Sequence, residues 1–460
     1  MSREDWRWNI YVLTVVQVVM RVAITSIKPF IPLYLPELGV TAADQVAFWA
    51  GVVTSANFVA QAFTQPLWGT LADRYGRKPM VVRSIVAVGT FNLLVAWATN
   101  VYQFAVLRFL MGSMAGFNAA AIALVAVHTP PQQLGYAVGL VQAGQMAGTI
   151  LGPAVGGVLA EWLGYRATFL VAGCLSLAMA PLVGWSVREE VPGRRGPADG
   201  PVGPERDRQA PDRACAGAVP AVADEEQVVD SWAVSSACTG EREPETAGTI
   251  PAANGEGRVK RAAGLNLPML AALVVVGCSQ FGTQSADSLL ALFVKEIYGG
   301  GQLNLAVSLA YALPAAANLA LAPVWGRLGD RRGHWAVLQF ALGGTALVVG
   351  LQGFSRSVAQ FLVLRTVAGL FAGGVMPNAH AVIGRMSRRS RRGRAYGVAG
   401  SALAIGNFAG PMVGGIVAAF LGVRAVFWVT ACLLLLVGAG VWGVQRTTAG
   451  VRNFLGGHAR

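Results

Sequence analysis

The chain has 460 residues, of which 54% are hydrophobic and only 13% are charged. Soluble domains carry roughly a quarter charged residues, so this composition excludes a soluble globular protein with an ordinary charged surface. The formal net charge of +13 would be compatible with nucleic-acid binding, but the positions of the charges favour a membrane topology and no nucleic-acid partner.

Twelve apolar segments follow one another along the chain, most of about 20 residues or more, the length needed to cross a bilayer. The predicted spans are 9–34, 46–70, 79–98, 101–127, 134–160, 165–187, 266–294, 303–328, 335–354, 358–383, 395–420 and 423–445. The first segment is too long and too charged for a cleavable signal peptide. We therefore expect an all-α polytopic membrane protein.

Basic residues gather in alternate connections between these spans. Arg74 and Arg77 lie between spans two and three, Arg331 and Arg332 lie between spans eight and nine, and the loop GRMSRRSRRGR follows span ten. The loops LPELGVTAADQ and TNVYQ, on the opposite side, carry no basic residue. The positive-inside rule then predicts a cell-membrane protein with both termini in the cytoplasm.

The sequence contains an internal repeat. WGTLADRYGRKPM begins at Trp68 and WGRLGDRRGHWAV begins at Trp325, 257 positions later. LRFLMGSMAG and LRTVAGLFAG keep this offset, and GPAVGG and GPMVGG, starting at Gly152 and Gly410, are 258 positions apart. The repeat predicts two pseudo-symmetric six-helix halves, 1–187 and 265–446, with the same membrane orientation, followed by a cytoplasmic tail, 447–460.

Residues 188–264 join the two halves. This segment is rich in Pro, Gly, Ala, Arg and acidic residues and lacks sustained apolar periodicity, which predicts a disordered cytoplasmic linker; a folded regulatory domain is the alternative. The five cysteines show no metal-ligand spacing, and no phosphate-binding loop or nucleophile–base cluster is present. We expect no metal, no cofactor and no enzymatic activity.

Three motifs carry a resemblance to a known family. GTLADRYGRK, from Gly69, resembles motif A of the major facilitator superfamily, LRFLMGSMAG resembles motif B, and GTILGPAVGG, from Gly148, resembles motif C of its twelve-span drug/proton antiporters. The resemblance covers both halves and not the linker. It implies a monomeric, proton-coupled secondary transporter in the lipid bilayer that exports small amphipathic molecules or drugs by alternating access.

Motif A and its repeat are predicted to form a conformational latch. A carboxylate at a helix junction can accept hydrogen bonds from a helix N-terminus in the other half, and a small residue lets a neighbouring backbone approach. The alternative is a charged turn that only anchors topology. His334 and Trp335 replace the Arg and Lys of the first copy, so the second latch should be weaker. The latch residues are Gly69, Asp73, Arg74, Gly76, Arg77, Gly326, Asp330 and Gly333.

Motif C places small residues on one helix face at every fourth position, which forms a groove for a partner helix, and its proline bends the span. The resemblance implies that this helix packs at the interface between the halves and limits leak. The motif residues are Gly148, Gly152, Pro153, Gly156 and Gly157, and in the repeat Gly406, Gly410, Pro411, Gly414 and Gly415.

Four ionisable residues stand out within the spans: Arg21 and Lys28 in span one, Arg108 in span four and Asp287 in span seven. Intramembrane charges are unfavourable unless they face water or a partner. We predict that Asp287 carries the proton with Lys28 as its partner, and the motif B resemblance implies a coupling role for Arg108. A fixed salt bridge is the alternative for the first pair, and symmetry with Arg365 is the alternative explanation of Arg108.

In this superfamily spans one, four, seven and ten line the central cavity, which implies a substrate site. The predicted cavity residues are Gln17, Arg21, Thr25, Asn118, Gln280, Gln284, Asn378 and His380. The excess of positive charge at Arg21, Lys28 and Arg108 leaves open a transporter of organic anions or metabolites. A membrane sensor without transport activity is a further alternative.

Overall fold

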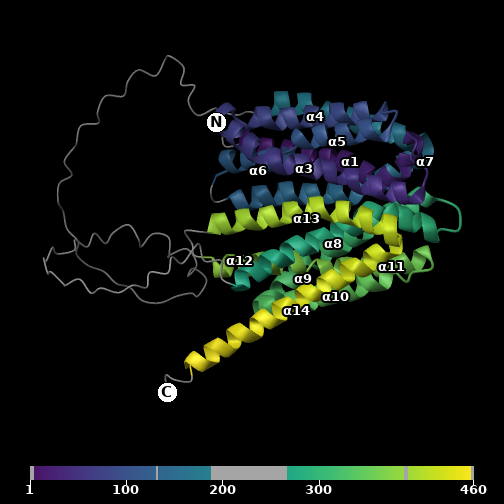
Figure 1. Cartoon of the computed structure of the whole chain (residues 1–460). Helices are drawn as coiled ribbons and strands as arrows, with labels where there is room; N and C mark the ends of the chain where they lie inside the picture. Colours follow the sequence, from purple (N-terminus) through teal and green to yellow (C-terminus); the bar gives the residue numbers. More distant parts are fainter. Residues whose placement is uncertain (1–4, 131–132, 188–266, 388–391, 457–460) are drawn as a thin grey trace, which may run out of the picture. The chain divides into compact units, whose positions relative to one another are not determined.

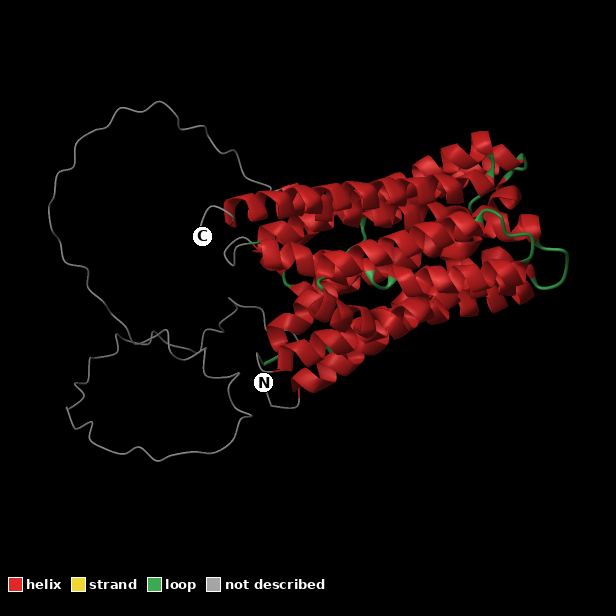
Figure 2. Ribbon diagram, turned by 90° about the horizontal axis from the view of Figure 1, so that it is seen from below, coloured by secondary structure: helices red, strands yellow, loops and turns green. Residues whose placement is uncertain are grey.

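The computed structural model describes residues 5–130, 133–187, 267–387 and 392–456, and its regular secondary structure within these ranges is entirely helical, with short connecting loops (Figures 1 and 2). The segment 188–264 lies outside the described residues, as do 457–460 of the tail. The helices of the first half are α1 Asp5–Ile27, η1 Lys28–Phe30, α2 Ile31–Tyr34, η2 Leu35–Leu38, α3 Ala43–Tyr75, α4 Arg77–Ala96, α5 Val101–Ser113, α6 Phe117–His128 and α7 Leu134–Ser186. Those of the second half are α8 Leu267–Ile297, α9 Leu303–Arg332, α10 His334–Gln352, α11 Val358–Ala372, α12 Val375–Met386, α13 Arg392–Leu421 and α14 Val423–Gly456.

Eleven segments of the described chain are long and apolar enough to cross a membrane. One of them is α7, whose 53 residues would extend about 80 Å at 1.5 Å per residue, far more than a bilayer core. Its helical backbone is interrupted at Gly164, where φ is 81°, a conformation that glycine adopts without strain. The chain reverses there, so α7 supplies spans five and six, and the predicted twelve-span all-α fold is confirmed.

Spans four and ten are each built from two helices. The chain leaves helical geometry between α5 and α6, where Gly116 has φ 130°. Helices α11 and α12 are separated by a turn at Gly373 and Gly374, whose dihedral angles stay in the right-handed helical region. These interruptions lie 257 positions apart, like the sequence repeat. Each six-helix half therefore has the same internal construction.

Four apolar clusters hold the helical part together. One, containing Leu13, Ile85 and Val141, belongs to the first half, and another, containing Val276, Leu338 and Ile383, belongs to the second. The other two mix the halves: Ile27 lies in a cluster with Leu289 and Val426, and Phe30 in one with Phe293 and Phe427. Helix α1 begins and α14 ends at the same end of the bundle (Figure 1). The unmixed clusters take residues 10–20 of α1 and Leu434 and Val441 of α14, whereas the mixed clusters take Ile27 of α1 and Val426 and Phe427 of α14, so the halves share their core toward the opposite end.

Candidate functional site

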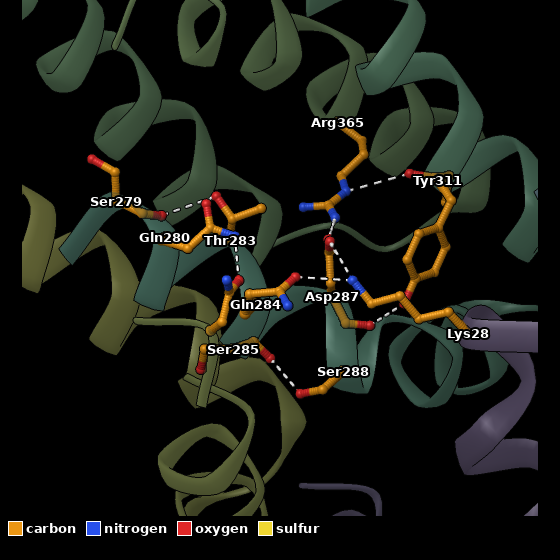
Figure 3. A network of polar contacts seen from close by, with 12 residues as sticks. Lys28, Ser279, Gln280, Thr283, Gln284, Ser285, Asp287, Ser288, Tyr311 and Arg365 are labelled. Carbon is orange, nitrogen blue, oxygen red and sulfur yellow. Dashed lines mark hydrogen bonds and ion pairs between the residues drawn. The ribbon is translucent and has the colours of Figure 1, made fainter. Parts of the chain in front are cut away.

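Asp287 lies in the middle of α8 and contacts cations from both halves (Figure 3). Arg365 of α11 donates a hydrogen bond from Nη2 to Asp287 Oδ1, and Lys28 Nζ lies 3.8 Å from Asp287 Oδ2. The side chains of Arg365 and Asp287 are 9% and 14% exposed. A buried charge requires a partner of opposite sign, and the two cations supply it for the carboxylate of Asp287. Lys28, Asp287 and Arg365 together carry one net positive charge when all three are ionised.

The end of span one positions Lys28. Helix α1 stops at Ile27, and Pro29 in η1 removes a backbone donor, which prevents the α-helix from continuing unchanged. Lys28 Nζ donates a hydrogen bond to Gln284 Oε1 at 2.9 Å. Gln284 precedes Asp287 by three residues on α8, so both side chains lie on one helix face. A single lysine of the first half thus contacts two adjacent residues of the second.

Helix α9 completes the arrangement. The Tyr311 hydroxyl donates a hydrogen bond to the backbone carbonyl of Asp287, and Arg365 Nε donates to the Ala310 carbonyl at 3.4 Å. Arg365 therefore connects α8 and α9 as well as neutralising the acid. Contacts among α8, α9 and α11 of the second half therefore hold the Arg365 side chain in place beside Asp287.

A cavity of about 330 Å³ opens beside this group. Thr25, Lys28 and Pro153 line it from the first half, and its wall in the second half includes Asp287 and Arg365. Leu342, Val349, Ala368 and Ala372 add apolar surface. An apolar wall with a few convergent polar groups is the usual composition of a small-molecule site.

Several predicted cavity residues lie near this group, and others form a separate polar cluster. Thr25 and Gln280 line the cavity, and Gln280 donates a hydrogen bond to Asn407 at 2.7 Å. Gln17 donates to Asn118 at 2.5 Å and to Gln145 at 3.3 Å. This second cluster joins α1, α6 and α7 within the first half.

Arg108 and Arg21 lie buried or half-buried in the first half. Arg108 is 8% exposed, and among the described atoms Nε of each arginine lacks a hydrogen-bond partner. Arg108 occupies the repeat position of Arg365, whereas Lys28 occupies the position aligned with Asp287. The second half thus has Asp287 beside Arg365, whereas the first half has Lys28 at the position aligned with Asp287.

The structure places Asn378 and His380 away from Asp287. Asn378 Oδ1 lies 2.8 Å from His334 Nδ1, and both residues line a second cavity with Asp330 and Arg385. The His380 ring lies at a tilt of 59° to the Tyr396 ring, with the centroids 6.1 Å apart. Val375 and Met376 at the start of α12 still line the first cavity, whereas Asn378 and His380 lie further along the span, about 20 Å from the Arg365 level at 1.5 Å per residue. One span therefore contributes to two sites.

Comparisons with known proteins agree with this architecture. A family model described as Major Facilitator Superfamily matches residues 13–311 and 272–457. The chain belongs to the Major Facilitator Superfamily. The resemblance of the sequence motifs, the fold class and the transport function that they implied are confirmed, and the family indicates a transporter rather than an enzyme.

Curated relatives and solved structures cover nearly the whole chain. It is 29% identical to a multidrug resistance protein MdtG of Escherichia fergusonii over 94% of this chain and 93% of the relative, and 29% identical to one of Yersinia enterocolitica over 96% and 94%. A bacterial homologue of the human lysosomal transporter Spinster, in an inward-facing and occupied conformation, has a TM-score of 0.71 at 15% identity over 97% and 98% of the chains. The human organic anion transporter MFSD10 has a TM-score of 0.58 at 17% identity over 95% and 99%.

The superfamily's motif A lies at two equivalent junctions. Gly76, with φ 97°, separates α3 from α4, and Gly333, with φ 90°, separates α9 from α10. A residue with a side chain would be strained at either position. Arg77 donates a hydrogen bond to the Ala123 carbonyl at 2.7 Å, which connects the first junction to α6.

The structure describes the side chain of one of the two latch carboxylates, Asp330, and not that of the other, Asp73. Asp330 Oδ1 lies 3.4 Å from His334 Nε2 and 3.5 Å from Arg385 Nη2, all within the second half. The side chain of Asp73 lies outside the described residues, while Arg74 lies over the Tyr75 ring. A Cβ on Gly69 or Gly326 would meet no atom within 4 Å. The expected close approach of a helix backbone at Gly69 is therefore not present in this structure, where the halves share their core toward the opposite end.

Motif C packs mainly inside its own half. A Cβ on Gly148, Gly152 or Gly156 would overlap atoms of α1, and a Cβ on Gly406, Gly410 or Gly414 would overlap atoms of α8. Only the last glycine of each motif faces the other half. Gly157 lies against Ser308 of α9, and Gly415 lies against Gly51 of α3. The expectation that this helix packs between the halves thus holds for the face that carries the last glycine. The glycines at every fourth position instead pack against the first span in one half and the seventh span in the other.

Sequence reasoning missed two residues of the central group, Arg365 and Tyr311. Arg365 was considered only as the symmetric mate of Arg108, although an arginine within an apolar span indicates a partner by itself. No spacing rule identifies Tyr311, because its contact with Asp287 depends on how α8 and α9 cross.

Proposed function

We propose that this protein exports small amphipathic molecules or drugs in exchange for protons by alternating access. The observation that carries the proposal is that Asp287, an acid within a membrane span, contacts Lys28 of one half and Arg365 of the other. Ionised Asp287 holds the two halves together through Lys28. A proton on Asp287 removes this attraction, so proton binding and the relative position of the halves become linked.

The names of the relatives support the choice of substrate class. They are multidrug resistance proteins, and a cavity with an apolar wall and few polar groups accepts varied amphipathic molecules. We further propose that the chain resides as a monomer in the cell membrane of a bacterium.

The test of proton coupling uses Asp287→Asn in proteoliposomes. We expect the variant to lose transport driven by an imposed proton gradient and to retain counterflow exchange of substrate, because binding does not require a titratable group. A fixed structural bridge predicts the opposite: Asp287→Asn would be unstable, and the double variant with Lys28→Gln would recover full proton-driven transport. That recovery would refute Asp287 as the proton carrier.

An organic anion is the second candidate substrate, and the charge of the spans favours it. The interior of the described spans holds four cations, Arg21, Lys28, Arg108 and Arg365, and one acid, Asp287, which contacts Lys28 and Arg365. Nε of Arg21 and of Arg108 has no hydrogen-bond partner among the described atoms, and a buried cation without an acidic partner attracts anions. Matched anionic and cationic analogues of one dye scaffold, offered as competitors in the same vesicles, distinguish the two. Binding of neither class and no flux would indicate a membrane sensor without transport activity.

The orientation is tested by cysteine labelling in intact cells. Thiols introduced at Asp44 and Thr99 should react with a membrane-impermeant reagent from outside. Thiols at positions 212 and 392 should not, because the basic loops are predicted to face the cytoplasm. External labelling at position 392 would reverse the proposed topology.

A further inference from the structure

The tryptophan that directly precedes each copy of motif A makes the same hydrogen bond in both halves. Trp68 of α3 donates from Nε1 to the Ser113 carbonyl at 2.6 Å. Trp325 of α9 donates from Nε1 to the Leu370 carbonyl at 2.7 Å. The two acceptors, like the two donors, are 257 positions apart. The bond is therefore part of the repeated construction and not an incidental contact.

Both acceptor carbonyls lie where a span is interrupted. Ser113 is the last residue of α5, and Leu370 lies in the last turn of α11. The final carbonyls of a helix lack intrahelical donors, and hydrocarbon offers no water to replace them. Each indole N–H supplies one donor at the break, which joins the broken span to the helix that carries motif A.

The same helical segments carry the two intramembrane arginines. Arg108 lies five residues before Ser113 on α5, and Arg365 lies five residues before Leu370 on α11. The two tryptophan environments differ in one respect. The Arg83 guanidinium lies 3.3 Å over the Trp68 ring, whereas the equivalent residue Phe340 packs against Trp325 with ring centroids 6.1 Å apart.

We propose that Trp68 and Trp325 are positioning residues that fix the arginine-bearing segments of spans four and ten to the motif A helices. Through these bonds the coupling site and the motif at the end of the bundle move as one body. The two bonds have different consequences, because Arg365 pairs with Asp287 while the aligned position in the first half is Lys28. Trp325 governs the Arg365–Asp287 pair and hence proton coupling, and Trp68 governs the position of Arg108. This inference rests on the proposed proton-driven transport.

The experiment compares Trp68→Phe and Trp325→Phe with Trp185→Phe, whose side chain is 87% exposed in the parent. Hydrogen exchange of the full-length protein in nanodiscs reports the breaks directly. We expect faster exchange at 114–120 in Trp68→Phe and at 373–379 in Trp325→Phe, and no change at either segment in Trp185→Phe. Unchanged exchange in the first two variants would overturn the positioning role, whether or not the protein transports.

Proton-driven transport is then measured against pH in proteoliposomes. We expect Trp325→Phe to move the midpoint of the pH profile upward by about half a pH unit, the size that one lost hydrogen bond supports, because a carboxylate with a loosened cationic partner accepts a proton more readily. Trp68→Phe and Trp185→Phe should keep the parental midpoint. Faster exchange at 373–379 with a parental midpoint would refute the link to Asp287, and a parent whose transport ignores pH would instead refute the proposed function.

A variant that keeps the shape of the bicyclic ring allows the test to be made even if the phenylalanine variant misfolds. If Trp325→Phe fails to insert, benzothienylalanine at position 325 replaces the indole N–H by sulfur and keeps the bicyclic ring. The same exchange and pH profile are expected. A parental result in both measurements would overturn the proposal.

Discussion

The ionisable groups of the central site are one carboxylate, Asp287, and the two cations that contact it, Lys28 and Arg365. Removing one partner of a buried ion pair leaves the other charge uncompensated, which is more unfavourable than removing both. Asp287 is bonded to Arg365 within its own half and lies 3.8 Å from Lys28 of the other half. Arg365 thus orients the acid, and Lys28 is the contact that must break when the halves separate.

Arg365→Gln should reduce proton-driven transport by on the order of tenfold or more, the loss expected for about 1.4 kcal/mol, because it removes the closest cation from Asp287. Arg108→Gln should have a smaller effect on proton coupling, because its Nε lacks a hydrogen-bond partner among the described atoms. Initial rates under an imposed proton gradient, normalised to counterflow exchange, measure both. Equal losses in the two variants would restore the coupling role that the motif resemblance implies for Arg108.

Helix packing in each half is set by small residues on spans five and eleven. Glycines let helix backbones approach in a bilayer, where apolar side chains gain little by meeting each other instead of lipid. Gly156 faces the backbone of Ser26, and Gly410 faces the backbone of Phe281. These approaches determine where α1 and α8 lie, and hence where Lys28 and Asp287 lie.

Gly156→Ala should destabilise the protein by about 1–3 kcal/mol, the range for an overpacked core, since the backbone of α1 would have to move away from the new Cβ. Gly139→Ala on the same helix is the matched control, because a Cβ there meets nothing within 4 Å and alanine is the better helix former. Thermal unfolding in detergent measures both. A parental melting temperature for Gly156→Ala would mean that α1 can shift freely.

A polar contact joins the halves at the end opposite the start of α1. Asn304 of α9 donates a hydrogen bond to Glu161 at 2.8 Å and accepts one from Tyr165 at 3.2 Å, both on α7. Each such bond contributes about 1 kcal/mol net. The contact therefore favours closure of this end.

Asn304→Ala removes both bonds and should shift the ensemble toward an opening of this end by a factor of about thirty, for a loss of about 2 kcal/mol. Distances between spin labels placed on either side of the contact measure the shift. Asn100→Ala is the control: Asn100 caps α5 at the same end through Gln103 and should lower local stability without changing those distances. An unaltered distance distribution in Asn304→Ala would show that apolar packing alone closes this end.

At the scale of the whole molecule, two interfaces between the halves are images of each other. Gly157 lies against Ser308, and Gly51 lies against Gly415. Ser308 follows Gly51 by 257 positions and Gly415 follows Gly157 by 258, so each contact pairs one repeat position with its partner in the other half. A pseudo-two-fold axis between the halves explains why the contact of α7 with α9 is repeated as the contact of α13 with α3.

The segment between the halves should be dispensable for transport. Its composition offers few large apolar residues to bury, and it need only join Val187 to Leu265. Deletion of 195–255 should leave membrane insertion and initial transport rates near the parental values. Normal membrane levels with lost flux would show that the segment regulates or contacts the helical part.

The spans and the repeat could be predicted from the sequence because they are local features: about 20 apolar residues cross a bilayer whatever their neighbours do. The left-handed backbone at Gly76, where φ is 97°, was not predicted, and the close approach expected at Gly69 is absent. The offset of 257 also marked Arg365 as the equivalent of Arg108, and an offset of 259 aligned Lys28 with Asp287.

Lys28 was predicted as the partner of Asp287, but the other contacts of this acid could not be predicted. The contacts of Asp287 with Arg365 and Tyr311 depend on the crossing of α8, α9 and α11, which side-chain packing sets over distances that no sequence spacing records. Asn378 likewise lines a second cavity with His334 although it shares a span with Arg365, while Val375 and Met376 of the same helix line the central one. Periodicity assigns a residue to a helix face, but the approach of one helix to another determines which partner that face meets.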